Sequence, residues 1–392
     1  MDDIHVDIDL TSPVLFGTLV ADNGRRIGMI TLNAEKTLNS LSLDMIDLIA
    51  AQLETWSTDE GLAIVILQAA GDKAFCAGGD LQNLYKSMLK HHASAERDDI
   101  RANQYARDFF DREYRLDYFI HTYPKPILCW GHGIVMGGGI GLMAGASHRV
   151  VTEKSRLAMP EIAIGLFPDV GGSYFLNRMP GKLGLFLALT GAMINTTDAK
   201  FTQLADYAIA QVDKSKVLDE LLRQPWGTTH DENSQLLDIV LRRSEIKLEI
   251  VQGPLQVHFE AINELCNKES LEQIIDAITS LDPEEAWLKK AVASLKSGSP
   301  SSAYLANLLL NQTVNSSLAD VFRLEYIAAL HCAARPDFAE GIRALLIDKD
   351  LKPQWNPATH AAITPEWVNG FIASPWSIEG HPLADLGMSK SY

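Results

Sequence analysis

The chain has 392 residues, of which 47% are hydrophobic and 21% charged, and its formal net charge is −16 at pH 7. Such a composition can bury a large core, and the length predicts two or three domains at roughly 150 residues each. The acidic excess argues against a surface that binds nucleic acid, because such a surface gathers lysine and arginine against the phosphates.

The first half of the chain alternates between strand and helix patterns. Four short apolar runs bounded by turn residues predict buried strands, at residues 27–32, 62–67, 126–130 and 149–152. Between the first two runs, apolar residues recur at helical spacing from Leu43 to Trp56, with Asp44 near the helix start. The alternation predicts an α/β core within residues 1–210. A polar stretch, residues 86–107, interrupts this core, and there we expect a mobile surface insertion or the start of an exposed helix.

The pattern changes after about residue 210. No strand-like run of comparable quality follows, whereas apolar residues recur at helical spacing, as they do from Leu271 to Leu281. Residues 227–234 and 297–302 have the composition of connecting loops. We therefore expect residues 211–392 to form a mostly helical region that packs on the α/β core.

Cysteine usage and the longest apolar run bear on the location of the protein. Four scattered cysteines lack C-x-x-C spacing, and we interpret them as reduced thiols: Cys76, Cys129, Cys266 and Cys332. The first ten residues are acidic, unlike a transit or signal peptide. Residues 126–146 approach membrane-spanning length but contain seven glycines and His132, which favours strand, turn and helix. We expect a soluble cytoplasmic protein that binds neither membrane nor nucleic acid and needs no metal or redox cofactor.

Two glycine-rich turns follow predicted strands. Residues 73–80 read KAFCAGGD, and residues 132–141 read HGIVMGGGIG. Glycine allows backbone paths that other residues disfavour, and it lets backbone N–H groups approach a ligand closely. Each turn alone is also typical of a strand-to-helix connection or of tight helix–sheet packing. One N–H from each turn, directed at one thioester carbonyl oxygen, would form an oxyanion hole worth about 3 kcal/mol per donor.

Two carboxylates follow prolines on an otherwise apolar segment downstream of these turns. Residues 159–172 read MPEIAIGLFPDVGG, which places Glu161 and Asp169 eight residues apart. A carboxylate in apolar surroundings can act as a tuned acid or base. Alone, Glu161 is typical of a helix start and Asp169 of a helix cap. Together, and downstream of two glycine turns, they predict an enzyme that acts on an acyl thioester.

Three segments of the chain resemble the crotonase (enoyl-CoA hydratase/isomerase) superfamily, namely residues 73–81, 124–142 and 157–176. The resemblance covers about residues 15–210. It implies a fold built on a superhelix of repeated ββα units. It also implies an acyl-CoA substrate whose thioester carbonyl binds in an oxyanion hole of two backbone amides, so that CoA is part of the substrate and no separate cofactor is needed.

The same resemblance assigns roles to individual residues. By motif position, the oxyanion donors would be the backbone N–H groups of Gly79 and Gly138. The loop from Ala74 to Ala77 would lie beside the adenine of CoA. Glu113, in the segment FFDREY before the third predicted strand, would lie on a helix near the hydroxyl end of the substrate.

Within the superfamily, the chain departs from the hydratases. Hydratases carry one glutamate three residues after the second oxyanion glycine, where this sequence has Gly141, and another in a Pro-Glu pair, kept here as Glu161. The segment MPEIAIGLFPDVGGSYFL is closely similar to that of the 3-hydroxyisobutyryl-CoA hydrolases, the thioesterases of valine breakdown. Residues 337–357 also resemble the helical extension of those enzymes. This resemblance implies hydrolysis of a short β-hydroxyacyl-CoA.

A hypothetical mechanism follows from this resemblance. Gly79 and Gly138 would hold the oxyanion, and Glu161 would act as general base towards water or attack directly. Asp169 would orient the water, or bind the hydroxyl and protonate the departing thiolate. One alternative is hydratase or isomerase chemistry, because dienoyl-CoA isomerases also place an aspartate eight residues after a glutamate. Another is a non-catalytic acyl-CoA- or RNA-binding relative. The acyl group stays open, as does assembly into a homo-oligomer.

Overall fold

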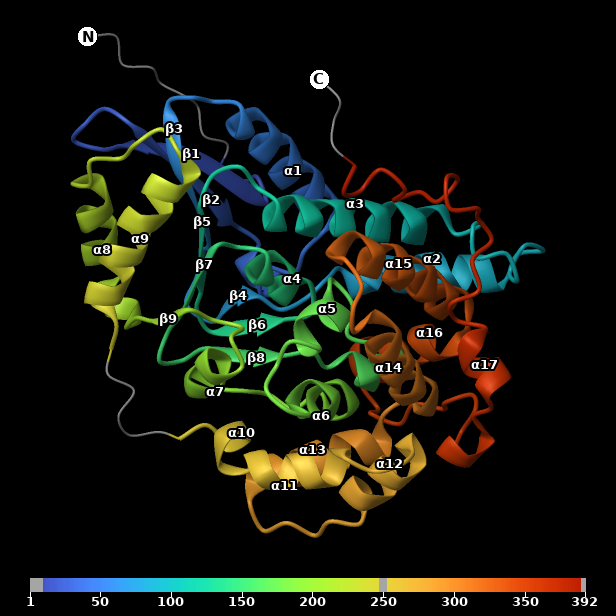
Figure 1. Ribbon diagram of the computed structural model, residues 1–392. Coiled ribbons are helices and arrows are strands. Elements are labelled where there is room, and N and C mark those ends of the chain that lie inside the picture. Colours follow the sequence, from blue (N-terminus) through green and yellow to red (C-terminus); the bar gives the residue numbers. More distant parts are fainter. Residues whose placement is uncertain (1–9, 247–251, 389–392) are drawn as a thin grey trace.

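The computed structural model describes residues 10–246 and 252–388. The acidic residues 1–9, which bear on the predicted cytoplasmic location, lie outside the described residues. A six-stranded sheet runs through the N-terminal half in the order β1-β2-β3-β5-β7-β9 (Figure 1). Only β1 and β2 pair antiparallel. The strands are β1 (Val14–Val20), β2 (Arg26–Leu32), β3 (Leu62–Ala69), β5 (Ile127–Gly131), β7 (His148–Val151) and β9 (Tyr207–Ala208).

A second, three-stranded parallel sheet has the order β4-β6-β8. Its strands follow directly after β3, β5 and β7 along the chain, so each successive pair gives one strand to each sheet. This arrangement confirms the repeated ββα core. Its further elements are β4 (Ala74–Cys76), β6 (Ile134–Met136), β8 (Arg156–Ala158), α2 (Leu81–His92), α4 (Gly138–Ala144) and the 3₁₀ helix η2 (Glu161–Ile164).

The four strands predicted from apolar runs are confirmed as β2, β3, β5 and β7. β3 is buried along nearly its whole length, as expected for a central parallel strand covered on both faces. The sequence pattern does not predict β1 and β9, nor the three-residue strands β4, β6 and β8. Strands this short are defined by pairing with distant partners, so they carry no periodicity of their own.

At residues 86–107 we expected a mobile surface insertion or the start of an exposed helix, and the structure has parts of two helices joined by turns. This stretch completes α2 and begins α3 (Gln104–His121). α2 buries Leu84, Met88 and His91 on one face. Its other polar residues lie mostly on the opposite face, towards solvent. The predicted helix at 43–56 is confirmed as α1 (Leu43–Ser57).

Residues 126–146 form β5, β6 and α4, which confirms the prediction of strand, turn and helix. All seven residues of α4 are buried. Within the described residues, no helix is both long enough and apolar enough to cross a membrane.

After β9, the described residues contain helices but no further strand, as predicted. α8 (Lys214–Leu222) and α9 (His230–Ser244) cover one face of the long sheet, where Val217 and Leu237 join the cluster around Trp130. Figure 1 shows these helices on the left of the sheet and α14 to α17 on the right, beside α2 and α3. The other helices are α5 (Gly172–Leu176), α6 (Leu183–Thr190), α7 (Thr196–Phe201), α10 (Pro254–Val257), α11 (Phe259–Cys266), α12 (Leu271–Thr279), α13 (Ala286–Ser297), α14 (Pro300–Thr313), α15 (Leu318–Ala334), α16 (Pro336–Ile342) and α17 (Pro365–Asn369).

The hydrophobic core does not divide at residue 210. One cluster of buried side chains extends from Val14 to Leu386, and a second extends from Ala21 to Leu241. Both clusters therefore contain residues from each side of the predicted boundary. The division of the chain into domains at residues 1–210 and 211–392 stays a prediction. The two parts pack together, because each hydrophobic cluster contains residues of both.

Candidate active site

A cavity of about 80 Å³ lies where the two glycine turns, α3 and the segment 160–170 meet. Its lining is apolar except for backbone groups and three carboxyl groups. Ala74 does not border it: this residue is buried in β4, where its carbonyl accepts a hydrogen bond from Asn39 Nδ2 at 3.0 Å. The other six predicted site residues all line the cavity: Ala77, Gly79, Glu113, Gly138, Glu161 and Asp169.

The two glycine turns meet at this cavity. The nitrogen of Gly79 lies 3.7 Å from the point where a Cβ on Gly138 would stand. Gly138 is the first residue of α4, so its N–H has no partner within the helix. Gly79 forms a bridge with Leu41, but the bonds of that bridge run from Leu41 N to Gly78 O and from Asp80 N to Leu41 O. Neither glycine N–H is used by the element that holds it, as an oxyanion hole requires.

Glu161 begins η2 directly after Pro160. Its side chain is buried, and its Oε2 has no hydrogen-bond partner among the described residues. Burial, reinforced by the charge of Asp169, raises the pKa of Glu161 well above its ordinary value. Gly165 caps η2 with φ +74°, and a Cβ there would approach the Asp337 carbonyl carbon to 2.4 Å. The close approach of α16 therefore fixes the helix that carries Glu161.

Asp169 is buried and hydrogen-bonded. The Tyr114 hydroxyl donates to its Oδ2 at 2.8 Å. Burial raises the pKa of Asp169 to about 6, while the bond from Tyr114 lowers it. Burial and the charge of Asp169 raise the pKa of Tyr114 well above its ordinary value, so Tyr114 keeps its proton as a donor. The sequence analysis did not identify Tyr114. The feature of the sequence that could have indicated it is its position directly after Glu113.

Two glycines of the second turn leave room for the predicted acids. A Cβ on Gly137 would meet Glu161 Oε1 at 3.0 Å. A Cβ on Gly138 would meet Glu113 Oε1 at 2.5 Å. The lack of side chains in this turn is therefore required by the carboxyl groups that approach it, in addition to the positive φ of Gly137.

Asp117 lies beside Gly141, the position where hydratases carry a glutamate. A Cβ on Gly141 would come within 2.8 Å of Asp117 Oδ2. Asp117 is fully buried, and neither carboxyl oxygen has a partner in the described part of the chain. Burial and the charge of Asp169 raise its pKa well above its ordinary value. The missed signal is its spacing of four residues from Glu113, which places both acids on one helix face.

Each carboxyl group around the cavity disfavours the ionisation of a neighbouring one. Burial, followed by the charges of Asp169, Asp117 and Glu161, raises the pKa of Glu113 well above its ordinary value. No lysine or arginine lines the cavity within the residues that the structure describes. Buried carboxyl groups with raised pKa values and no cation beside them are suited to general acid–base catalysis.

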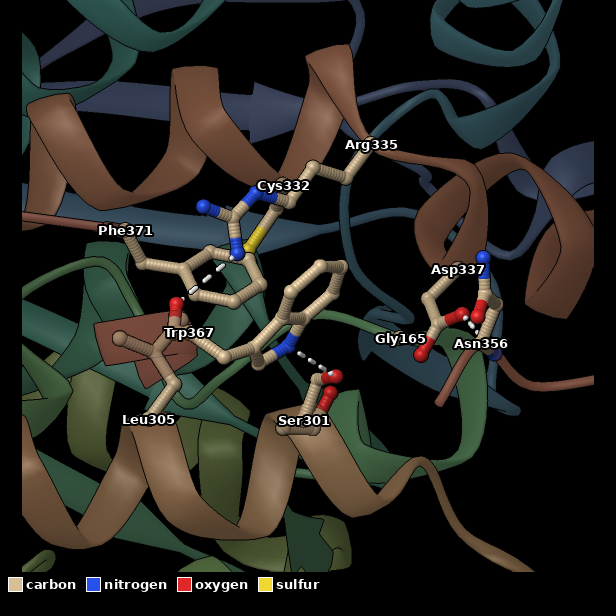
Figure 2. Close-up of a pocket in the computed structure, with 10 residues that line it drawn as sticks. Gly165, Ser301, Leu305, Cys332, Arg335, Asp337, Asn356, Trp367 and Phe371 are labelled. Carbon is tan, nitrogen blue, oxygen red and sulfur yellow. Dashed lines mark hydrogen bonds between the residues drawn. The ribbon is translucent and has the colours of Figure 1, made fainter. Parts of the chain in front are cut away.

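A second, much smaller pocket of about 10 Å³ lies between Gly165, at the end of η2, and residues from α14 to α17 and their connections (Figure 2). There Arg335 lies 3.6 Å from the ring centroid of Phe371 and donates a hydrogen bond to the Trp367 carbonyl at 3.2 Å. Asp337 accepts the N–H of Asn356 at 2.8 Å. This space holds about one water molecule. We interpret it as a packing junction that ties the C-terminal region to η2.

The described residues include no group of three or more His, Cys, Asp or Glu side chains that could hold a metal ion. All four cysteines are buried and unpaired in disulfides. The polar groups that line the cavity are carboxyl groups and backbone amides, and Tyr114 reaches it through Asp169. The expectation that no metal or redox cofactor is needed stays a prediction.

A family model described as enoyl-CoA hydratase/isomerase matches residues 27–372. The chain belongs to the enoyl-CoA hydratase/isomerase family. The mitochondrial 3-hydroxyisobutyryl-CoA hydrolase of Danio rerio is 40% identical over 349 residues, which cover 89% of this chain and 87% of that protein. The Homo sapiens protein of the same name is 36% identical over 347 residues, with coverage of 88% and 86%.

Solved structures of family members extend the likeness to the fold. A crystal structure described as an enoyl-CoA hydratase from Rhodobacter sphaeroides 2.4.1 has a TM-score of 0.78 and 31% identity, covering 93% of this chain and 98% of that one. A carnitinyl-CoA dehydratase from Mycobacterium thermoresistibile has a TM-score of 0.77 and 32% identity, with coverage of 92% and 96%. The family likeness thus includes the helical C-terminal region and confirms the resemblance inferred from the motifs.

Proposed function

We propose that this protein hydrolyses a short β-hydroxyacyl-CoA thioester, and specifically converts 3-hydroxyisobutyryl-CoA and water to 3-hydroxyisobutyrate and CoA. The observation that carries the proposal is the set of relatives named 3-hydroxyisobutyryl-CoA hydrolase, which are 35–40% identical over about 88% of the chain. The cavity supports it, because it combines buried carboxyl groups with the N–H groups of Gly79 and Gly138, which donate no hydrogen bond within the described part of the chain. In valine breakdown, such a reaction releases the free acid from CoA.

In the proposed reaction, the N–H groups of Gly79 and Gly138 bind the thioester carbonyl oxygen and stabilise the oxyanion. Glu161 takes a proton from water as the water oxygen adds to the carbonyl carbon, or it adds to that carbon itself and forms an anhydride that water then opens. The C–S bond breaks as the tetrahedral intermediate collapses, and the CoA thiolate takes up a proton. Asp169 orients the water or supplies that proton. Glu113 binds the hydroxyl end of the acyl group.

Hydration or isomerisation of an enoyl-CoA is the second candidate, because the two solved relatives are described as a hydratase and a dehydratase. One observation weighs against it. Asp117 fills the space beside Gly141, so the glutamate that hydratases carry there has no room unless Asp117 moves. Asp117 itself does not border the cavity, so it does not replace that glutamate as a group in contact with the substrate.

Location, assembly and partners other than acyl-CoA stay predictions. The relatives are mitochondrial by name, which supports a mitochondrial location as the alternative to the predicted cytoplasmic one. The net charge of −16 supports the proposal that nucleic acid is not a partner, over the alternative of a non-catalytic RNA-binding relative. The binding of the CoA adenine beside the loop 74–77 stays a prediction: Ala77 lines the cavity, whereas Ala74 does not.

The test is thiol release from four CoA thioesters, followed with a colorimetric thiol reagent. The panel contains 3-hydroxyisobutyryl-, 3-hydroxypropionyl-, acetyl- and crotonyl-CoA, with the enoyl absorbance of the last recorded in parallel. We expect rapid thiol release from the two β-hydroxyacyl substrates and slow release from the others. Loss of the enoyl absorbance without thiol release would instead establish hydratase activity and refute the proposal.

A further inference from the structure

The turn that carries Asp169 has an unfavourable backbone conformation. Val170, the next residue, has φ +52°, and Gly171 has φ +82°. A β-branched residue in the left-handed region is a rare outlier, because its side chain crowds the backbone there. Such a conformation persists only where the surrounding structure holds it in place, and residues of this kind concentrate at functional sites.

Glu325 holds this turn from the C-terminal region. It lies on α15, where its Oε2 accepts the N–H of Gly171 and its Oε1 accepts the N–H of Ser173, each at 2.8 Å. Its side chain is fully buried. None of the ion pairs among the described residues involves Glu325. Burial of an ionisable group without a cation is unfavourable, so its retention at this point indicates a specific task.

Asp169 is thus held from two directions. Tyr114, on α3, binds its carboxyl group, while Glu325, on α15, binds the backbone two and four residues further on. Glu325 does not border the cavity itself. The groups that face it are Asp169, whose charge raises the pKa of Glu325, and Asp117 and Tyr114, whose pKa values Glu325 raises. Glu325 therefore reaches the site both through its charge and through the turn, and its direct contacts are the two hydrogen bonds to the turn.

We propose that Glu325 is a positioning residue, which fixes the Asp169 carboxyl group in its working place by binding the N–H groups of Gly171 and Ser173. The inference rests on the proposed hydrolase function. It means that the helical C-terminal region contributes to catalysis through a defined pair of hydrogen bonds. A sequence signal exists, because Glu325 lies on the apolar face of α15, three residues after the buried Phe322.

The test compares two variants that differ in their distance from the site. Glu325→Gln keeps the shape of the side chain but turns an amide N–H₂ towards one backbone N–H, so one bond is lost. Asp198→Asn is the matched control, since Asp198 is also fully buried and accepts two backbone N–H groups, from Leu255 and Gln256, without bordering the cavity. Both variants should unfold at a lower temperature than the unmodified protein.

Only the first variant should lose catalysis. We expect Glu325→Gln to lower kcat for 3-hydroxyisobutyryl-CoA by about 10- to 100-fold, with KM changed less than about twofold, because misplaced catalytic groups affect the reaction more than binding. Asp198→Asn should keep kcat within about twofold. If Glu325→Gln does not fold, Glu325→Asp, which keeps the carboxyl group on a shorter side chain, takes its place with the same expected loss.

A double-variant cycle separates positioning from general loosening of the fold. If Glu325 acts through Asp169, adding Glu325→Gln to Asp169→Asn should lower the residual rate less than about twofold. An equal loss with and without Asp169, or unchanged kcat in folded Glu325→Gln, would overturn the inference. Thiol release by the unmodified protein is measured first. Its absence would refute the proposed function, whereas its presence with a normal Glu325→Gln rate would refute only the positioning role.

Discussion

Buried acids that share one cavity define the chemistry at the scale of single residues. Glu113, Glu161 and Asp169 line the cavity, and Asp117 lies directly behind Gly141. The charge of each acid raises the pKa of at least one neighbouring group, and burial raises the pKa values of all four acids. Burial raises the pKa of Asp169 to about 6, and the Tyr114 hydroxyl, which stabilises its ionised form, opposes this rise.

The tyrosine gives a testable pH dependence. We expect an ionisation near pH 6 in the profile of kcat/KM, which reports groups of the free enzyme. Tyr114→Phe removes a donor to the ionised carboxylate, so the pKa of Asp169 should rise and the ionisation should move to higher pH by about one unit. Tyr118→Phe, on the same helix, is the control and should leave the ionisation in place.

The side of the ionisation on which activity is lost, acidic or alkaline, also assigns the role of Asp169. Activity lost below the ionisation means that Asp169 works as a carboxylate that orients water, whereas activity lost above it means that Asp169 donates a proton. A shift to lower pH in Tyr114→Phe, or none, would contradict the assigned hydrogen bond. The measurement is a set of initial rates of thiol release between pH 5 and pH 9.

Sequence patterns identify some of these residues and miss others for physical reasons. Glu161 and Asp169 follow prolines on an apolar segment, so their chemistry is visible in the chain itself. Tyr114 and Glu325 gain their roles only from tertiary contacts with the Asp169 turn. Those contacts depend on how α3 and α15 pack, which no local pattern records.

At the scale of elements, α4 is a helix whose glycines are required by its neighbours. Gly141 has the Asp117 carboxyl on one side and the Val170 Cβ within 2.8 Å of its own missing Cβ. The apolar run of β5 and the glycines of α4 predict strand, turn and helix correctly. Which groups require those glycines depends on the tertiary packing, and the apolar run does not indicate it.

A substitution at Gly141 tests this requirement. Alanine is a better helix former than glycine by about 1 kcal/mol, so propensity alone would predict stabilisation. We expect Gly141→Ala to destabilise the protein by about 1–3 kcal/mol instead, because the added methyl group overpacks the site. Urea unfolding measures the difference in the free energy of unfolding.

The control for this prediction is Gly17→Ala in β1, where a Cβ would meet nothing within 4 Å. That variant should change the free energy of unfolding by less than about 0.5 kcal/mol. Stabilisation by Gly141→Ala, or equal effects at the two positions, would show that the space beside Gly141 is not filled as described.

At the scale of the whole molecule, the C-terminal region completes the site. α16 contacts the end of η2 through Gly165 and contributes Phe338 to the cavity lining, while α15 binds the Asp169 turn. α8 and α9 cover the long sheet. The change from strand to helix patterns near residue 210 is visible in the sequence and marks a change of architecture. The hydrophobic clusters nevertheless continue across it.

This continuity predicts the behaviour of a fragment. Residues 1–210 expressed alone would expose the apolar surface that the later helices cover. We expect the fragment to lack a cooperative urea transition and to bind a hydrophobic dye, whereas the full chain unfolds cooperatively. A sharp transition and a fixed near-ultraviolet circular dichroism signal in the fragment would show an independent core domain.

Thiol release by Glu161→Gln is the most direct measurement of the proposed mechanism. Gln keeps the size of the side chain but can neither take a proton from water nor attack the thioester, so hydrolysis of 3-hydroxyisobutyryl-CoA should fall by about 100-fold or more. The exposed Glu54→Gln serves as control and should retain the full rate. Near-normal turnover by folded Glu161→Gln would contradict the assignment of Glu161 as the group that activates water or attacks the substrate.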